Sequence, residues 1–262
     1  MPRFCANLTM LYSELDFLDR FEAAKRDGFE GVEYLFPYPY PKEQLAERLK
    51  RYGLTQVLHN LPAGDWGSGD RGIACQPERR DEFRAGIVTA IDYATALGCK
   101  QVNCLAGVPA RDADPQALHR TFVDNVRLAA SELKKASIRL LVEPVNTRDI
   151  PGFWLNRSSQ AEAILNEVGS DNLAIQYDFY HTQVMEGDLV NTFRRLKDRI
   201  AHVQIADNPG RNEPGTGEIN YPFIFDVLDR EGYQGWIGCE YKPAAATSEG
   251  LGWFAPYRSR ST

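Results

Sequence analysis

The hydrophobic and polar positions of this chain form short apolar runs that alternate with longer amphipathic segments. Each apolar run has the length and the β-rich content of a strand. These runs occupy residues 4–10, 31–36, 55–60, 101–107, 139–146, 173–180, 201–207 and 236–242. The clearest helix-like segments occupy residues 17–28, 42–53, 79–98, 118–137 and 158–169. Four of these five segments end on a glycine, which is common directly after a helix.

Strands that alternate with helices indicate a parallel sheet, and eight is the number of strands that closes a (β/α)₈ TIM barrel. An open, doubly wound sheet is the alternative. That fold usually has a glycine-rich turn after its first strand, whereas residues 7–10 read Asn-Leu-Thr-Met. The chain of 262 residues has no linker or change of composition, so we expect residues 1–262 to form a single TIM-barrel domain.

Four polar residues stand near the C-terminal ends of the last four runs: Glu143, Asp178, Gln204 and Glu240. The gaps between them are 35, 26 and 36 residues, which is the length of a strand–helix–strand repeat. A charged side chain on a buried strand is costly unless it is paired or holds a metal. Because active sites of such barrels lie at the C-terminal ends of the strands, we expect these four residues to meet in one site.

Two glutamates, one aspartate and one amide offer a metal only oxygen atoms. Hard divalent cations prefer such ligands, so Mg²⁺ is the first expectation and Mn²⁺ the second, ahead of zinc or copper. The alternative interpretation is that these residues cap helices and form structural salt bridges.

Two of the four histidines stand where substrate would bind. His181 follows Asp178 by three residues, and His59 lies at the end of the third apolar run. A lone histidine is more often a structural hydrogen-bonding group, and only the place at the expected barrel mouth favours a role for these two. His202 shares a strand face with Gln204 one layer deeper and is expected in the core.

Two loops carry the remaining candidates. The glycine-rich loop 60–77 matches no phosphate-binding motif and has the composition of a flexible lid, with Arg71 on it. Arg211 in loop 207–220 suits a substrate carboxylate, since its planar guanidinium binds carboxylates with two hydrogen bonds. Lys242, at the end of the last apolar run, completes the substrate-binding candidates.

Composition excludes several classes of function. The net charge of −6 and the lack of a basic stripe argue against nucleic-acid binding. No apolar run approaches the roughly 20 residues of a membrane span, and charges interrupt the N-terminus too early for a signal peptide. Five cysteines without a CxxC pair predict neither a disulfide framework nor a thiolate zinc site. We therefore expect a cytoplasmic protein with no membrane partner; self-association stays open.

A metal beside two glutamates suits proton transfer next to a carbonyl group. The cation stabilises an enediolate, one glutamate removes a proton from carbon, and the other returns a proton to the adjacent carbon. This chemistry isomerises or epimerises small hydroxy-carbonyl compounds and needs no organic cofactor.

Long stretches of the sequence resemble the hydroxypyruvate isomerase family, within the xylose-isomerase-like TIM barrel superfamily. The similarity runs from RFCANLTMLY near the start to GWIGCEYKP and GLGWF near the end. Its most specific parts are HNLPAGDWGSGDRGIACQP, QYDFYHTQ and HVQIADNPGRNEPGTGEINY.

The resemblance implies a reversible conversion of hydroxypyruvate into tartronate semialdehyde (2-hydroxy-3-oxopropanoate). It implies that Glu143 and Glu240 are the acid–base pair and that Asp178 and Gln204 join them as metal ligands. In the wider superfamily a histidine often occupies the position of Gln204, so the glutamine departs from that pattern and lowers the expectation of zinc. The aspartate–histidine pair of the superfamily is present as Asp178 and His181.

Three other functions stay open. A related group isomerises the four-carbon acid 2-oxo-tetronate and shares the first and last motifs, although loop 60–77 is closer to the hydroxypyruvate group. A metal-dependent nuclease on the same barrel would need a histidine-rich zinc site and a basic surface. A non-catalytic sugar-binding barrel would not need the paired glutamates.

Overall fold

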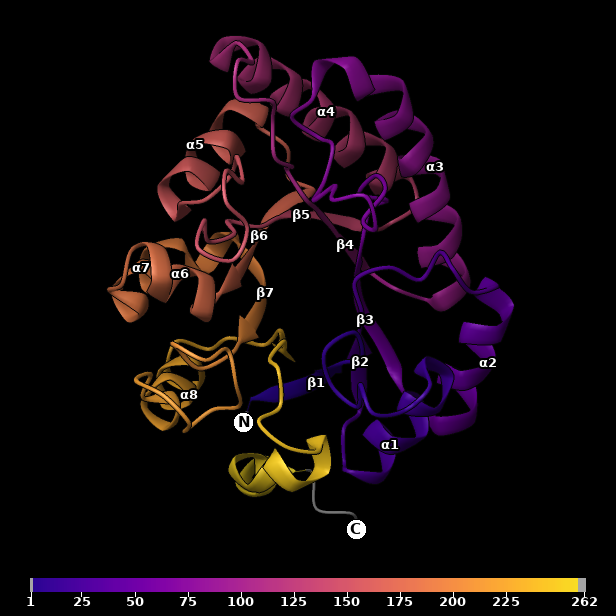
Figure 1. The fold of residues 1–262 in the computed structure, drawn as a ribbon, viewed down its shortest axis with the longest axis vertical. Helices are drawn as coiled ribbons and strands as arrows, with labels where there is room; N and C mark the ends of the chain where they lie inside the picture. Colours follow the sequence, from indigo (N-terminus) through magenta and orange to yellow (C-terminus); the bar gives the residue numbers. More distant parts are fainter. Residues whose placement is uncertain (1, 259–262) are drawn as a thin grey trace.

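A computed structural model describes residues 2–258, in which eight parallel strands form a closed barrel surrounded by helices (Figure 1). Each strand pairs with the next in sequence, and β8 pairs with β1 to close the ring. The predicted (β/α)₈ barrel is therefore confirmed. The strands are β1 (Arg3–Asn7), β2 (Gly31–Glu33), β3 (Thr55–Asn60), β4 (Gln101–Cys104), β5 (Arg139–Val142), β6 (Leu173–Asp178), β7 (Ile200–Ile205) and β8 (Trp236–Cys239).

The helices lie where the amphipathic segments predict them, and several short elements were not predicted. Glycines at 53, 98 and 169 follow helices with positive φ, a conformation that glycine adopts without steric cost. The α-helices are α1 (Arg20–Arg26), α2 (Lys42–Tyr52), α3 (Arg80–Leu97), α4 (Pro115–Lys135), α5 (Ser158–Val168), α6 (Phe179–Met185), α7 (Leu189–Leu196) and α8 (Tyr221–Arg230). The 3₁₀ helices are η1 (Phe17–Asp19), η2 (Pro77–Arg79), η3 (Lys197–Arg199) and η4 (Thr247–Tyr257).

Most strands end before the apolar runs that predicted them. The run at 139–146 contains a strand only to Val142, and the run at 236–242 only to Cys239. Glu143 and Glu240 are therefore the first residues beyond their strands. The apolar runs are longer than the strands because the loops after the strands also pack over the end of the barrel and bury their side chains.

The barrel interior is filled with side chains on its N-terminal side. A small apolar cluster that includes Val57, Leu141 and Ala174 packs there against Trp236. The guanidinium of Arg3 lies 4.0 Å from the centre of the Trp236 ring and covers it from outside. This packing closes one end of the barrel, so a ligand can reach the interior only from the C-terminal end.

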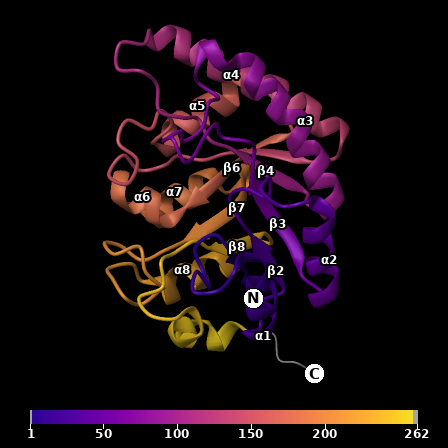
Figure 2. The same ribbon diagram turned by 45° about the vertical axis from the view of Figure 1, so that its right-hand side comes forward.

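Strand register brings the polar residues into one layer. Asn7 is paired with Glu33, Asn60 with Asn103, and Asp178 with Gln204. The loops that follow these strands gather at the same end of the barrel (Figure 2). No helix within residues 2–258 combines the length and apolar character needed to cross a bilayer.

Candidate active site

A cavity of about 140 Å³ opens at the C-terminal ends of the strands. Most of its polar lining comes from β5 to β8 and their loops, including Glu143, His181, Gln204, Arg211 and Glu240, and Asn7, Glu33 and Asn60 add to it from β1 to β3. Its apolar side includes Tyr34, Leu58, Trp66, Leu105 and Val145. The cavity therefore joins charged groups to a wall of hydrocarbon, as expected for a small-molecule site.

Asp178 does not itself line the cavity, but it forms a buried group with Glu143 and His181, which do. His181 Nε2 lies 3.8 Å from a carboxylate oxygen of Glu143 and 3.8 Å from Asp178 Oδ2. Asp178 Oδ1 accepts hydrogen bonds from the first backbone N–H groups of α6, but Oδ2 has no partner among the described residues. A buried carboxylate oxygen without a donor is costly, and a cation would satisfy it.

The neighbours of His181 determine which ring nitrogen carries the proton. Its Nδ1 lies 3.4 Å from the backbone nitrogen of Asn146, whose N–H can only donate, and 2.6 Å from Asn146 Nδ2. Burial, and then the charge of Arg211, lower the pKa of His181 well below its usual range, so the ring is neutral. A neutral ring that accepts at Nδ1 carries its hydrogen on Nε2. His181 therefore offers a donor toward the two carboxylates and suits a substrate oxygen better than a metal.

The carboxyl groups of the site repel one another in a space with little water. Burial raises the pKa of Glu143 well above its usual range, and the charges of Glu240 and Asp178 add to this. Burial likewise raises the pKa of Glu240 to about 8 and that of Asp178 to about 6, although Arg211 opposes both shifts. Such crowding favours either a bound cation or a proton held by one of the glutamates.

Glu240 is held by three donors. Its Oε1 accepts from a terminal nitrogen of Arg211 at 2.7 Å, and its Oε2 accepts from Gln204 Nε2 at 2.5 Å and Asn7 Nδ2 at 3.3 Å. On the other side of the polar layer, Asn103 Nδ2 donates to Glu143 at 2.9 Å. The two glutamates that the sequence singled out thus enter the same cavity from β5 and β8 with fixed orientations.

Gln204 lies in the site, but its amide nitrogen faces the carboxylates. Nε2 donates to Glu240 and, at 2.7 Å, to Glu33, while Oε1 accepts from Gln176 Nε2 at 2.6 Å. A ligand role for the oxygen requires half a turn of the amide. Gln176 Nε2 faces that position, so the Gln176 amide must turn as well; its Oε1, which has no partner among the described residues, would then accept from the turned Gln204. The donor set of Glu143, Asp178, Glu240 and Gln204 therefore fits a hard cation, provided that both amides turn.

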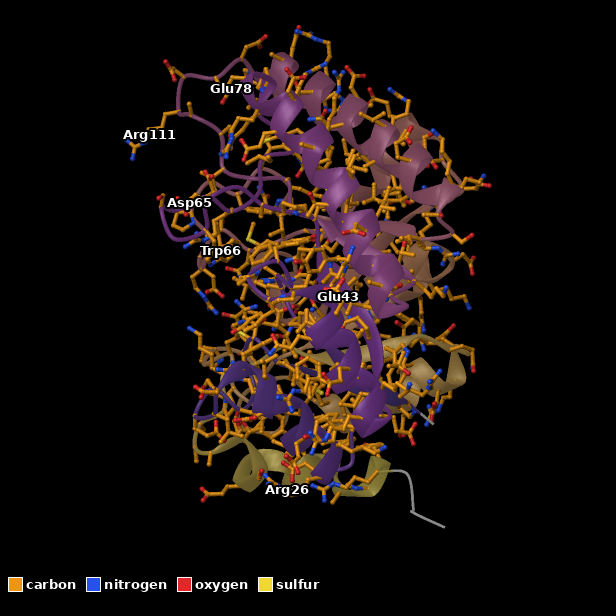
Figure 3. All side chains as sticks on the ribbon, turned by 90° about the vertical axis from the view of Figure 1, so that its right-hand side faces the viewer. Arg26, Glu43, Asp65, Trp66, Glu78 and Arg111 are labelled. Atoms are coloured by element: carbon orange, nitrogen blue, oxygen red, sulfur yellow. The ribbon has the colours of Figure 1, made fainter. Side chains whose placement is uncertain are left out.

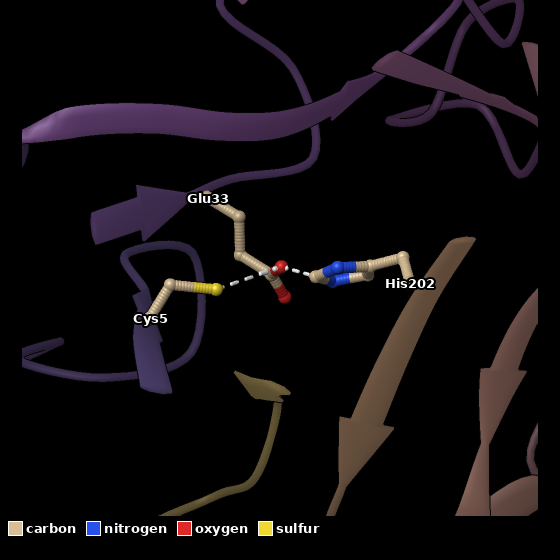
Figure 4. A group of neighbouring side chains, drawn as sticks. All are labelled: Cys5, Glu33 and His202. Atoms are coloured by element: carbon tan, nitrogen blue, oxygen red, sulfur yellow. Dashed lines mark hydrogen bonds and ion pairs between the residues drawn. The ribbon is translucent and has the colours of Figure 1, made fainter. Parts of the chain in front are cut away.

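Glu33 is a central residue of the site that sequence reasoning passed over. It is 1% exposed and lines the cavity, and each of its oxygens has two donors. Oε1 accepts from Asn7 and Gln204, and Oε2 accepts from His202 Nε2 at 2.6 Å and Cys5 Sγ at 3.4 Å (Figure 4). Because both oxygens are already satisfied, we interpret this group as a hydrogen-bonding centre and not as a cation site.

The environment of Glu33 has the opposite electrostatic effect to that of Glu143. Burial alone would raise the pKa of Glu33, but His202 and the amide donors outweigh it and lower the pKa below its ordinary value. His202 is fully buried in the barrel interior, where it was expected. A signal for Glu33 was present in the sequence, since it is a charged residue inside the apolar run 31–36.

Arg211 is the cation that lines the cavity. Besides Glu240, it contacts Asp149 Oδ2 at 3.2 Å, and its guanidinium lies 5.1 Å from the centre of the Tyr180 ring. Arg211 Nε is buried without a partner among the described residues. Arg71 lies elsewhere: it stacks 4.2 Å from the Trp66 ring and donates to the carbonyls of Trp66 and Asp70.

Like Arg71, two more of the predicted substrate contacts, His59 and Lys242, do not line this cavity. His59 does not line the cavity; its Nδ1 lies 3.0 Å from the Asn60 carbonyl and 3.4 Å from the Tyr38 hydroxyl. Alternate residues of a strand face opposite sides, and Leu58 and Asn60 are the ones that face the cavity. Lys242 also lies away from the cavity, with an exposed side chain, because the chain turns outward after Glu240.

Comparisons with a family model and with curated proteins assign the chain to the same family. Residues 21–257 match the family model described as xylose isomerase-like TIM barrel. The chain is 54% identical to the hydroxypyruvate isomerase of Escherichia coli (strain K12) over 98% of its own length and 100% of that protein. It is 48% identical to the 2-oxo-tetronate isomerase of Cupriavidus necator over 99% of its length and 100% of that protein.

Solved structures agree on the fold. A crystal structure described as an AP endonuclease of family 2 from Brucella melitensis has a TM-score of 0.97 and 45% identity, with 99% of this chain and 100% of that chain covered. The apo form of a 3-keto-D-glucoside 4-epimerase from E. coli has a TM-score of 0.79 at 21% identity, with 98% and 99% covered. At that identity the likeness extends to the fold alone.

We predict that Glu33→Ala lowers the free energy of unfolding by about 3 kcal/mol or more, because it leaves several buried donors without an acceptor. Chemical denaturation monitored by circular dichroism measures the change. Glu30→Ala is the matched control, since Glu30 is exposed and lies just before the same strand. Equal stability of the two variants would contradict the central role of Glu33.

Proposed function

The chain belongs to the xylose isomerase-like TIM barrel family, and within it we propose that the protein converts hydroxypyruvate reversibly into tartronate semialdehyde. Its relatives make it an isomerase of the hydroxypyruvate and 2-oxo-tetronate type, which acts on small molecules. The observation that supports the reaction is the pair Glu143 and Glu240, which directly follow β5 and β8 and enter one cavity. A pair of this kind can hold one proton between two positions and move it.

The reaction transfers one proton between neighbouring carbons. One glutamate, as carboxylate, takes a proton from C3 of hydroxypyruvate, and the electron pair moves to form an enediolate. The other glutamate, as acid, gives a proton to C2, while the hydroxyl proton passes from the C3 oxygen to the C2 oxygen. His181 Nε2–H is placed to donate to one of these oxygens, and Arg211 to hold the carboxylate at C1.

The ligand residues of the proposed divalent cation are Glu143, Asp178, Glu240 and, after the amide turn, Gln204. A bound cation would withdraw electrons from the carbonyl and stabilise the negative charge of the enediolate. Oxygen donors alone support Mg²⁺ first and Mn²⁺ second, with no organic cofactor. All five cysteines are free and buried, which supports a reducing compartment, and we propose the cytoplasm.

Isomerisation of 2-oxo-tetronate is the second candidate, supported by the 48% identity to an enzyme of that name. The proton transfer would be the same, with a hydroxymethyl group on C3. The higher identity to a hydroxypyruvate isomerase supports the three-carbon acid. A nuclease function draws on the description of the Brucella structure, but the net charge of −6 and the small number of histidines, four, argue against a histidine-rich zinc site on a basic surface.

We expect protein treated with a chelator to be inactive in D₂O and to recover with Mg²⁺ or Mn²⁺. NMR would follow deuterium incorporation and product from hydroxypyruvate and from 2-oxo-tetronate. The expected preference for hydroxypyruvate in kcat/KM is about tenfold or more, the usual effect of one extra carbon in a fitted pocket. Preference for the four-carbon acid would favour the second candidate, and no exchange with any metal would refute both.

Glu143→Gln and Glu240→Gln should each lower kcat by about 10²- to 10⁴-fold, because the amide keeps the shape but can neither take nor give the proton. Steady-state kinetics measures the loss, and circular dichroism checks that the fold is kept. Glu47→Gln on the exposed face of α2 is the control. Turnover at the wild-type rate in either site variant would exclude that glutamate from the reaction.

Arg211→Ala should raise the KM for hydroxypyruvate by about 10- to 100-fold, because a charge-assisted hydrogen bond to the substrate carboxylate is lost. A decrease in kcat is also expected, since Arg211 holds Glu240. Arg71→Ala is the comparison, because Arg71 does not line the cavity. A larger rise in KM for Arg71→Ala than for Arg211→Ala would reverse the assignment.

A further inference from the structure

Trp66 separates the cavity from a second, larger hollow. Its side chain lines the active-site cavity of about 140 Å³ and also an outer groove of about 710 Å³. Within residues 2–258 it is the one residue that lines both spaces. The groove is mainly apolar, with Phe36, Tyr38, Pro62, Ala63 and Ala85 among its lining residues.

The indole is held in this position from two sides. The ring of Phe36 packs against it at 5.1 Å between centroids, and the guanidinium of Arg71 lies 4.2 Å from its centre. The loop itself is anchored by an ion pair of 2.8 Å between Asp70 and Arg79. Figure 3 shows Trp66 beside Asp65 at the loop-covered end of the barrel. These contacts hold Trp66 in a defined position in the cavity wall.

Several other apolar residues of the cavity are packed in the core, with no second groove behind them in the described part of the chain. Tyr34, Leu58 and Leu105 are 2%, 3% and 8% exposed and are packed in the core. Shortening one of them would leave a closed void, whereas shortening Trp66 would join the cavity to the groove. Trp66 is therefore the residue at which the cavity can be joined to this groove.

A substrate with a longer carbon chain would extend toward the same wall. In the proposed reaction, the carboxylate and the oxygens on C2 and C3 use the polar side of the cavity. Any carbon added beyond C3 must extend away from these groups, toward the apolar side that Trp66 helps to form. We propose that Trp66 sets the maximum chain length of the 2-oxo acid and that its removal lets longer chains extend into the groove. This inference rests on the proposed 2-oxo acid substrate.

A binding series tests this without turnover. Pyruvate, 2-oxobutanoate, 2-oxopentanoate and 2-oxohexanoate lack the C3 hydroxyl and serve as inert probes, with calorimetry in Mg²⁺ buffer as the measurement. In the wild type, affinity should fall once the chain exceeds three or four carbons. In Trp66→Ala it should instead rise by about fourfold for each further methylene that enters the apolar groove. Trp66→Leu, a milder change in the same loop, should give an intermediate result.

The groove can be closed again from its far side. Ala85→Phe, on the exposed face of α3, should abolish the gain of Trp66→Ala for 2-oxohexanoate and leave pyruvate binding unchanged. A chain-length profile in Trp66→Ala that equals that of the wild type would overturn the proposal, as would a failure of both proteins to bind any probe. A shifted profile without isomerisation of hydroxypyruvate would support Trp66 as the wall and reject the proposed reaction alone.

Discussion

Buried negative charge at one end of the barrel is the constraint on which the rest of the site depends. A carboxylate that leaves water must regain its hydrogen bonds from protein donors or from a cation. Two side-chain amides supply many of these hydrogen bonds, because Asn7 and Gln204 each donate to both Glu33 and Glu240. Strand register makes this sharing possible, since it sets these side chains in one layer of adjacent strands.

Two glutamates at neighbouring depths acquire different properties from this arrangement. Glu33 has four donors and a lowered pKa, so it remains charged and holds its partners in place. Glu143 faces two other carboxyl groups, and its pKa is raised. The same residue type is therefore a fixed anion in one position and, in the proposed reaction, a proton carrier in the other. Without a cation, the NH₂ group of Gln204 donates to two carboxylates at once, and the amide turn proposed for metal binding would replace these hydrogen bonds.

The repeat pattern was sufficient to predict the barrel, because buried strands and amphipathic helices have distinct periods. The same period brought Glu143, Asp178 and Glu240 together, as each follows or ends a parallel strand. It was harder to predict which individual side chains point into the cavity. The pairing of β2 with β3 shifts between Val32 and Glu33, and on β3 the cavity is lined by Leu58 and Asn60 but not by His59. Glu33 was missed because its role depends on donors from β1 and β7, which are distant in sequence.

The plug of side chains around Trp236 has a consequence for kinetics. A barrel that is filled at its N-terminal end opens only at its C-terminal end. Substrate must therefore enter, and product must leave, through the same opening. Substrate cannot arrive while product still occupies the cavity, so the two compete for free enzyme. In a reversible isomerisation, where both compounds have the same atoms and nearly the same shape, inhibition by product follows from the architecture. The net direction of flux then depends on how quickly a later reaction consumes the aldehyde.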